Sequence, residues 1–316
     1  MPISDLPPEL HAHIVALSCS QILSSLELPT AHILSLVSSY WNLIARPFRY
    51  HSLRVAGQGN IAKLLQHLDR LPECERRVRY FSLSDSFQPE DQSDDRAEYL
   101  RKSDISRLLA LVAPSLFMLE LHLGDPAYAT GLFAFFWQCR CPHLVSLWIK
   151  GYYCFAVSLS NPSDVKSSKL NFPHLEHLSL DGIPNPSGLL SHGILANAFP
   201  RLASLEIHGL HGALSFAREV AEAVAERDES SKRTSTKKKS TVLISQLPQT
   251  LNSLSLFPSS SISTKNSKRA RIVHDEMMGV LLQLRKRDSG EARVDSSLQV
   301  VIGNPDIDMM SHSLRS

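Results

Sequence analysis

The sequence predicts an α/β protein in which a short helical N-terminal module precedes a stack of strand–helix repeats. Three observations predict this architecture. A leucine-spaced motif recurs along the chain, segments with helical periodicity separate its copies, and the N-terminal segment carries apolar residues at helical spacing. Strands and helices that alternate in this way, each too small to bury its apolar face alone, must stack on their neighbours.

The recurring motif has the form L-x-x-L-x-L or its isoleucine variant, usually with a proline before it. The last two apolar residues are two apart, so they share one face of a short strand, and the first residue lies in the turn before it. The first four clear copies are 28, 31 and 27 residues apart. The leading apolar residues are Leu116, Leu144, Leu175, Leu202 and Leu251, with a weaker early copy at Val78.

Segments with helical periodicity lie between these copies and are expected to link successive strands. They cover residues 99–113, 127–138, 187–198, 214–227 and 274–287. Polar stretches near residues 86–98 and 226–240 are expected to be disordered insertions. An alternative is a set of unrelated strand–helix units in an open doubly wound sheet. No glycine-rich phosphate loop follows a predicted strand, which argues against the nucleotide-binding versions of that fold.

The motif resembles the leucine-rich repeat family over residues 71–302. The sequence departs from the family pattern because the usual Asn or Cys at the end of the motif is missing. Leu121 is followed by His122 and Leu180 by Asp181. The units therefore resemble the irregular, helix-bearing class. This resemblance implies a β/α solenoid with a horseshoe-like course.

The N-terminal module is expected to contain two helices. The first begins at the prolines that follow Leu6, and Leu10, Ile14 and Leu17 form one apolar stripe along it. The second is expected over about residues 31–45, with Leu34, Val37 and Trp41 on one face, and Arg46-Pro47 ends it.

Two stretches of this module resemble an F-box, particularly the version found in fungal proteins. They are Leu6-Pro7-x-Glu9-Leu10-x3-Ile14 and Leu36-Val37-Ser38-x2-Trp41-x4-Arg46-Pro47-x2-Tyr50. The stretch between Glu9 and Trp41 is longer than usual, with residues 18–28 as the additional material. The resemblance implies a Skp-type adaptor of a cullin ubiquitin ligase as partner. The residues expected to contact that adaptor are Leu6, Pro7, Ile14, Leu36, Val37 and Trp41.

The expected organisation is therefore an F-box-like module over residues 1–53, a connecting helix over 54–70, the repeat array over 71–302 and a flexible tail over 303–316. The function implied is that of the substrate-recognition subunit of a ubiquitin ligase, which holds an unknown target protein through its repeats. The alternative is a leucine-rich-repeat scaffold without a ligase link, whose N-terminal helices form a cap.

Composition and charge narrow the function further. The formal net charge of +2 gives no global field that would favour nucleic acid or a membrane, so neither is expected as a partner. The chain has no long apolar run. Its five cysteines form no CxxC pair, which favours a reducing compartment, the cytoplasm and/or the nucleus.

The sequence predicts no enzyme activity, catalytic residue, metal or cofactor. No cysteine lies within metal-ligand spacing of the two H-x-x-H pairs, and Cys139 and Cys141 are too close together for a zinc knuckle. The basic runs near 232–239 and 268–271 have two functional interpretations, import signals or charged arms that touch nucleic acid. The interpretation as flexible charged insertions between repeats is favoured over both. The two histidine pairs are His174/His177 and His208/His211.

Overall fold

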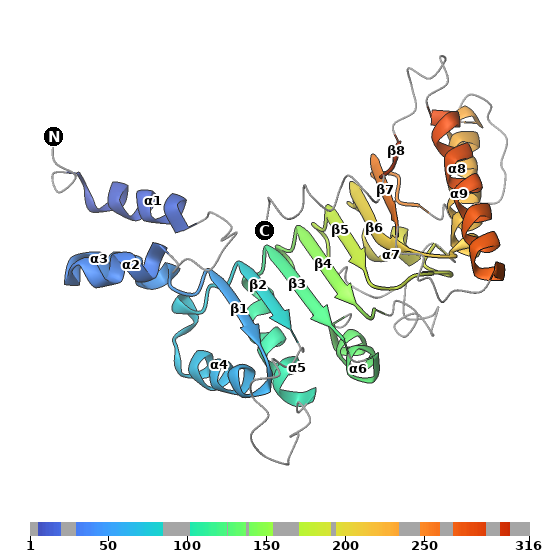
Figure 1. Cartoon of the computed structure of the whole chain (residues 1–316). Helices are drawn as coiled ribbons and strands as arrows, with labels where there is room; N and C mark the ends of the chain where they lie inside the picture. The colour runs from blue at the N-terminus through green and yellow to red at the C-terminus, as the bar shows by residue number, and fades with distance from the viewer. Residues whose placement is uncertain are drawn as a thin grey trace, which may run out of the picture.

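The computed structural model describes residues 6–19, 30–84, 102–124, 126–136, 139–153, 171–190, 194–233, 247–259, 268–288 and 298–303. Within them, eight strands form one parallel sheet whose spatial order follows the chain from β1 to β8 (Figure 1). The chain is α/β, as the sequence predicts. The strands are β1 (Ser52–Ala56), β2 (Tyr80–Ser84), β3 (Met118–Leu123), β4 (Ser146–Gly151), β5 (His177–Asp181), β6 (Ser204–Leu210), β7 (Ser253–Pro258) and β8 (Gln299–Ile302).

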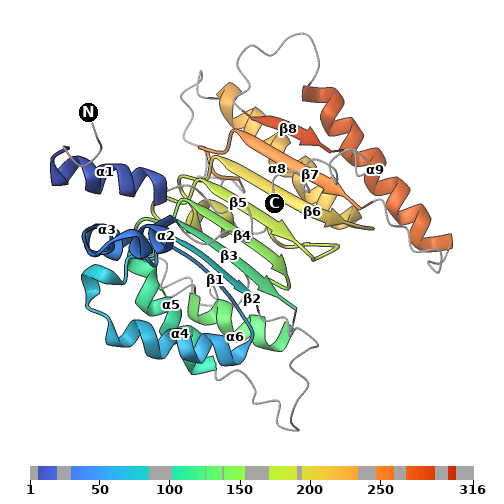
Figure 2. The same ribbon diagram turned by 60° about the vertical axis from the view of Figure 1, so that its left-hand side comes forward.

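The order of the described strands never reverses. A doubly wound sheet reverses its strand order at a switch point, so this sheet differs from that alternative. Right-handed crossovers between strands that advance in one direction place the connecting helices on one face. Figures 1 and 2 show α4, α5 and α6 together along one side of the first strands. The helices beyond the N-terminal module are α4 (Gln58–Arg70), α5 (Lys102–Val112), α6 (Pro126–Phe136), α7 (Ile194–Ala198), α8 (Leu214–Arg233) and α9 (Lys268–Asp288), with short 3-10 turns η3 (Glu73–Glu75) and η5 (Ala113–Ser115).

Two rows of aligned apolar side chains run across the whole sheet and face these helices. Helix residues such as Phe133 on α6 and Phe216 on α8 belong to the same buried cluster as both rows. The first row is Leu53, Phe81, Leu119, Leu147, Leu178, Leu205, Leu254 and Val300. The second row is Val55, Leu83, Leu121, Ile149, Leu180, Ile207, Leu256 and Ile302.

The leading residue of each predicted motif is also buried in this core, in the segment just before its strand. These residues are Val78, Leu116, Leu144, Leu175, Leu202 and Leu251. The motif spacing therefore predicted correctly the strands from β2 to β7 and the buried residue that precedes each of them. Burial of one such side chain stabilises the fold by about 1.5–3 kcal/mol, and every strand contributes two or three.

Several predicted boundaries were wrong. Residues 54–56 belong to strand β1 and not to a connecting helix, which begins only at Gln58. Leu53-x-Val55 has the two-apart apolar spacing of the motif but lacks its leading leucine. The helix expected over 187–198 is short, because residues 187–190 form a turn that includes Gly188 at φ 84° and α7 begins at Ile194.

The prediction of a disordered insertion near 226–240 is wrong for the first residues of that stretch. Helix α8 continues to Arg233, and the guanidinium group of Arg227 donates hydrogen bonds to the carbonyls of Pro248 (3.2 Å) and Gln249 (3.0 Å). These contacts tie the helix to the turn before β7. The rest of that stretch, the stretch near 86–98, and the tail beyond Gly303 lie outside the described residues.

Glycines allow close backbone approach where strands β4 and β5 end. Gly151 (φ 97°) is the register partner of Leu123, and a Cβ built on it would lie 1.9 Å from the Leu123 carbonyl oxygen. Gly182 (φ 108°) follows β5, and a Cβ there would lie 2.6 Å from the Cα, N and O atoms of Gly151. Both the positive φ and the approach of rigid backbone exclude a side chain here.

Gly182→Ala is therefore expected to lower the free energy of unfolding by about 2 kcal/mol or more, since neither backbone can move without disturbing the strand pairing. Urea denaturation followed by circular dichroism measures it. Gly279→Ala is the matched control, because that position lies in α9 and an added Cβ there would contact nothing within 4 Å beyond the backbone of its own helix and its chain neighbours. The control should gain up to about 1 kcal/mol from helix propensity. Equal stabilities of the two variants would contradict the steric explanation.

Candidate interaction surfaces

The N-terminal helices have a small core of their own, separate from the core of the sheet. They are α1 (Pro8–Cys19), α2 (Thr30–Val37) and α3 (Ser39–Ala45), followed by the 3-10 turn η2 (Arg46–Phe48). Val15, Ala31 and Ala45 are buried between them. The partly buried side chains packed on this small core are Leu34, Trp41, Ile44 and Phe48.

The single helix predicted over about 31–45 is in fact two helices that meet at Ser38. Ser38 is extended (φ −163°, ψ 165°), and its hydroxyl accepts a hydrogen bond from the backbone N–H of Trp41 at 3.2 Å. Serine favours such a cap because its side chain satisfies an N–H that has no partner in the first turn. The break separates the predicted face, because Leu34 and Trp41 turn inward whereas Val37 is exposed.

The apolar stripe predicted on the first helix points outward. Leu10, Ile14 and Leu17 are all exposed, and the buried positions of α1 are His11 and Val15. The Nδ1 atom of His11 lies 2.5 Å from the hydroxyl of Tyr40, and its ring packs 5.1 Å from that of Trp41. This hydrogen bond lets a polar ring occupy the interior of the module.

Large apolar side chains are consequently exposed on all three helices. The most exposed are Leu36 (78%) and Leu43 (68%). Exposed apolar surface that is concentrated in this way is typical of a binding site for another macromolecule. The full set is Leu10, Ile14, Leu17, Ile33, Leu36, Val37, Tyr40 and Leu43, here called the helical apolar surface.

The residues predicted to contact an adaptor differ in how far the structure exposes them. Pro7, Ile14, Leu36 and Val37 are exposed, whereas Leu6 and Trp41 are partly buried. The sequence did not single out Ile33, Tyr40 and Leu43, which are exposed on α2 and α3 as well. Tyr40 and Leu43 belong to the helix that begins after the break at Ser38, which periodicity alone does not reveal.

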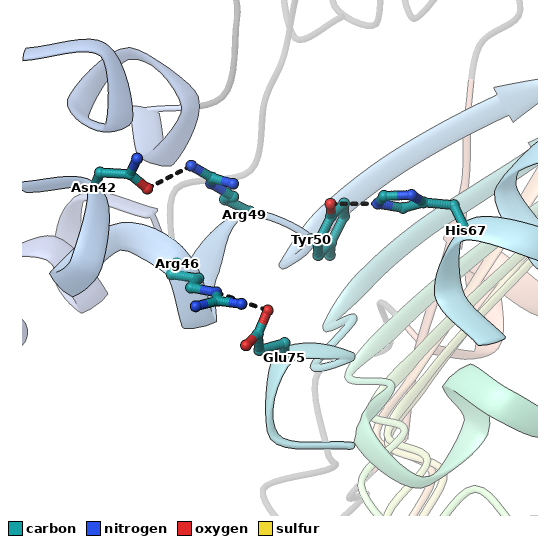
Figure 3. Close-up of polar contacts among 6 residues, drawn as sticks. All are labelled: Asn42, Arg46, Arg49, Tyr50, His67 and Glu75. Atoms are coloured by element: carbon teal, nitrogen blue, oxygen red, sulfur yellow. Dashed lines mark hydrogen bonds and ion pairs between the residues drawn. The ribbon is translucent and has the colours of Figure 1, made fainter. Parts of the chain in front are cut away.

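Polar contacts connect the end of the module to the first strand–helix unit (Figure 3). The Nε atom of Arg46 lies 3.0 Å from the Glu75 carboxylate, and the hydroxyl of Tyr50 lies 2.6 Å from Nε2 of His67. The carbonyl of His51 accepts hydrogen bonds from the backbone N–H groups of Arg79 (2.9 Å) and Tyr80 (2.8 Å). The module therefore leads directly into the edge of the sheet at β1.

The second surface is the face of the sheet opposite the helices, here called the open face. Trp148, on the central strand β4, is 41% exposed there. Nε2 of His122 lies within hydrogen-bond distance, 2.7 Å, of the Glu120 carboxylate on the same strand β3. The pKa of Glu120 is lowered to about 2, chiefly by the hydrogen bond from His122 and against the opposing effect of burial. The charge interaction with His122, a hydrogen bond from Ser82 and the positive charge of Lys150 lower it further.

A similar pair lies on β6, where Glu206 and His208 approach to 3.6 Å. The ring of His208 stacks on Phe257 of β7 at 4.2 Å with an interplanar angle of 5°. The alternation of the motif predicts that one set of strand residues faces outward, namely His177, Ser179, Glu206, His208 and Ser255. Ser255 is nevertheless buried, because it is small and lies between its larger register neighbours Glu206 and Val301. His177 is exposed, and Ser179 is partly buried.

The remaining histidines of the two H-x-x-H pairs contact other side chains. Nδ1 of His174 lies 2.9 Å from the Arg201 guanidinium, and the His211 ring packs 5.0 Å from that of His274. No group of three or more metal-ligating side chains occurs among the described residues. Burial raises the pKa of Cys139 to about 11 and that of Cys141 to about 12, which keeps both thiols protonated and poorly nucleophilic.

The basic run at 268–271 forms the exposed first turn of α9, and only the first two residues of the run at 232–239 are described, at the end of α8. None of the described helices combines the length and apolar character needed to cross a bilayer. No family model, curated protein or solved structure matches the chain. Functional assignment therefore rests on the helical apolar surface and the open face.

His51, at the junction of module and sheet, makes the stability depend on pH. Burial lowers the pKa of its imidazole from 6.5 to about 4, and the positive charges of Arg79 and Arg77 add to this effect. The folded state therefore favours the neutral ring. Its contribution to stability is fully present above pH 6.5 and is lost as the pH falls towards 4.

The free energy of unfolding should accordingly fall between pH 7 and pH 5 by about 1–2 kcal/mol through this residue. His51→Gln removes the titrating group, so the variant should lose less stability than the wild type over the same interval. Urea denaturation at both pH values measures the difference. This interval lies above the range in which Glu120 titrates. Parallel losses in both proteins would show that His51 is not responsible.

Proposed function

We propose that this chain is the substrate-recognition subunit of a Skp–cullin–F-box type ubiquitin ligase. The proposal rests chiefly on one observation, the helical apolar surface. Three short helices expose eight large apolar side chains while their own small core stays apart from the core of the sheet. Amphipathic helices that dock on a partner use such side chains as anchors. In this assignment the helices are the F-box, and the partner is a Skp-type adaptor.

The remainder of the chain is proposed to be an irregular leucine-rich-repeat solenoid with a horseshoe-like course. Three features support this part of the proposal. The strand order follows the chain order, each leucine motif supplies one strand, and the leading leucine is buried before that strand. Repeat proteins use the exposed face of such a stack to bind other proteins.

In this proposal the chain supplies no catalytic group of its own. The helices hold the adaptor and the sheet holds a target protein, so the two partners share one scaffold. The effective concentration of the target near the ubiquitin-charged enzyme rises as a result. Rate enhancement comes from this proximity and orientation.

The alternative is a scaffold protein in which the helices form a cap at the end of the sheet. The contacts that favour it are those of the junction, where Arg46 meets Glu75 and Tyr50 meets His67. In the ion pair the Arg46 side chain is 54% exposed and the Glu75 side chain 14% exposed, and ion pairs at a protein surface contribute about 0–1 kcal/mol to stability. A cap also buries its apolar side chains on the neighbouring strand, whereas Leu36 and Leu43 are exposed.

The double variant Leu36→Asp/Leu43→Asp tests the assignment. It places two charges in the helical apolar surface, so binding of a purified Skp-type adaptor should weaken by about tenfold or more. Isothermal titration calorimetry with the full-length chain measures the affinity. The melting temperature should stay within about 2 °C of the wild type, because both side chains are exposed.

Ile272→Asp on α9 is the matched control, since Ile272 is also half exposed but lies far along the chain from the module. This control should bind the adaptor as the wild type does. Undiminished adaptor binding by the double variant would refute the F-box assignment. A fall of several degrees in its melting temperature would instead favour the cap.

A further inference from the structure

The open face is unusual for an all-parallel sheet. Such sheets are normally covered on both faces, and here the described helices pack on the leucine rows of one face only. The open face bears an exposed tryptophan, Trp148, at the centre of the sheet. Tryptophan is the residue type most enriched among side chains that dominate binding energies.

The open face also carries one short motif twice at the same register. Glu120 and His122 on β3 are two apart, as are Glu206 and His208 on β6. The strand pairings align Glu120, Trp148, Ser179 and Glu206 in one row across four strands. Three strand spacings of about 4.8 Å place the two glutamates about 14 Å apart, with Trp148 between them.

Charge on this part of the face is negative. Among the described strand positions of this face from β3 to β6, Lys150 is the one lysine or arginine, against the carboxylates of Glu120, Asp181 and Glu206. Lys150 is the register partner of Asp181 and also lowers the pKa of Glu120, so it is shared between two carboxylates and the face keeps an excess of negative charge. Glu120 stays ionised across the neutral range because its pKa is lowered to about 2. The side chain of Glu206 is 42% exposed and can meet a further cation.

We propose that the open face of β3–β6 binds an extended segment of the target protein with the pattern basic-x-apolar-x-basic. The outer basic side chains meet Glu120 and Glu206, and the central apolar side chain packs on Trp148. The inference deepens the proposed function, on which it rests for assigning the open face to a target.

The spacing of that pattern follows from strand geometry. An extended chain advances about 3.4 Å per residue, so side chains four apart are separated by about 14 Å. Residues two apart in an extended chain point to the same side, which places the central apolar side chain midway between the two basic ones, over β4 and β5 and beside the ring of Trp148. Charge-assisted hydrogen bonds to carboxylates are the strongest class available to the flanking arginines or lysines.

Fluorescence anisotropy with labelled peptides and the full-length chain tests this proposal. The probe is the peptide Gly-Ser-Arg-Ser-Leu-Ser-Arg-Ser-Gly, which has the proposed spacing. Two peptides serve as comparisons: Gly-Ser-Arg-Arg-Leu-Ser-Ser-Ser-Gly, with the same composition and the wrong spacing, and the first peptide with both arginines replaced by glutamate. Each should bind at least about tenfold more weakly than the probe.

Variants then assign the contacts. Trp148→Ala and Glu206→Gln should each weaken binding of the probe by about tenfold. The matched control is Glu276→Gln, an exposed glutamate on α9 that should leave affinity unchanged. Circular dichroism melts verify folding, and Trp148→Phe should retain part of the affinity because the aromatic contact remains.

The proposal is overturned if the probe does not bind below about 1 mM. It is also overturned if the comparison peptides bind equally well, or if Glu276→Gln weakens binding as much as Glu206→Gln does. Adaptor binding measured on the same preparations separates this inference from the proposed function. Trp148→Ala should retain adaptor binding, and Leu36→Asp/Leu43→Asp should retain peptide binding. Either contact can therefore fail while the other stands.

Discussion

The burial of two continuous rows of leucine-type side chains between the sheet and its helices is the constraint on which the rest of the structure depends. A single strand of five residues with one helix cannot bury its apolar face, so each unit is stable only against its neighbours. The strand pairings keep the rows in register from β1 to β8. Because the rows occupy alternate positions, the remaining strand positions are left for the open face.

The helical module obeys a different constraint, which is the cap at Ser38. Its hydroxyl starts α3 at a new angle and turns Trp41 towards His11 and Tyr40. Trp41 is therefore partly buried inside the module and contributes less to its exposed surface. Leu36 and Leu43, on either side of the cap, stay in solvent. Ser38 thus helps to determine which apolar side chains of the module are buried and which are exposed.

The sequence predicts the interior of the sheet better than its surfaces. Motif spacing identified the strands from β2 to β7. It missed β1 and β8, because Leu53-x-Val55 and Val300-x-Ile302 both lack the leading leucine. Periodicity also identified the stripe of Leu10 and Ile14, yet a stripe has no intrinsic direction, and only packing decides whether it faces inward. For the open face, alternation gave the correct side for Glu206. The alignment of that residue with Glu120 requires the strand register, which depends on loop lengths between repeats.

The leucine rows also set the geometry of recognition. Equal motif positions on successive strands fall into one row, so any side chain repeated in the motif recurs at multiples of the interstrand distance. Four residues of an extended ligand span nearly the same distance as three interstrand spacings of the sheet. A stack held together by leucines is therefore already commensurate with an extended chain laid across it. Changing the open-face residues would alter the proposed recognition and leave the buried rows, and so the fold, intact.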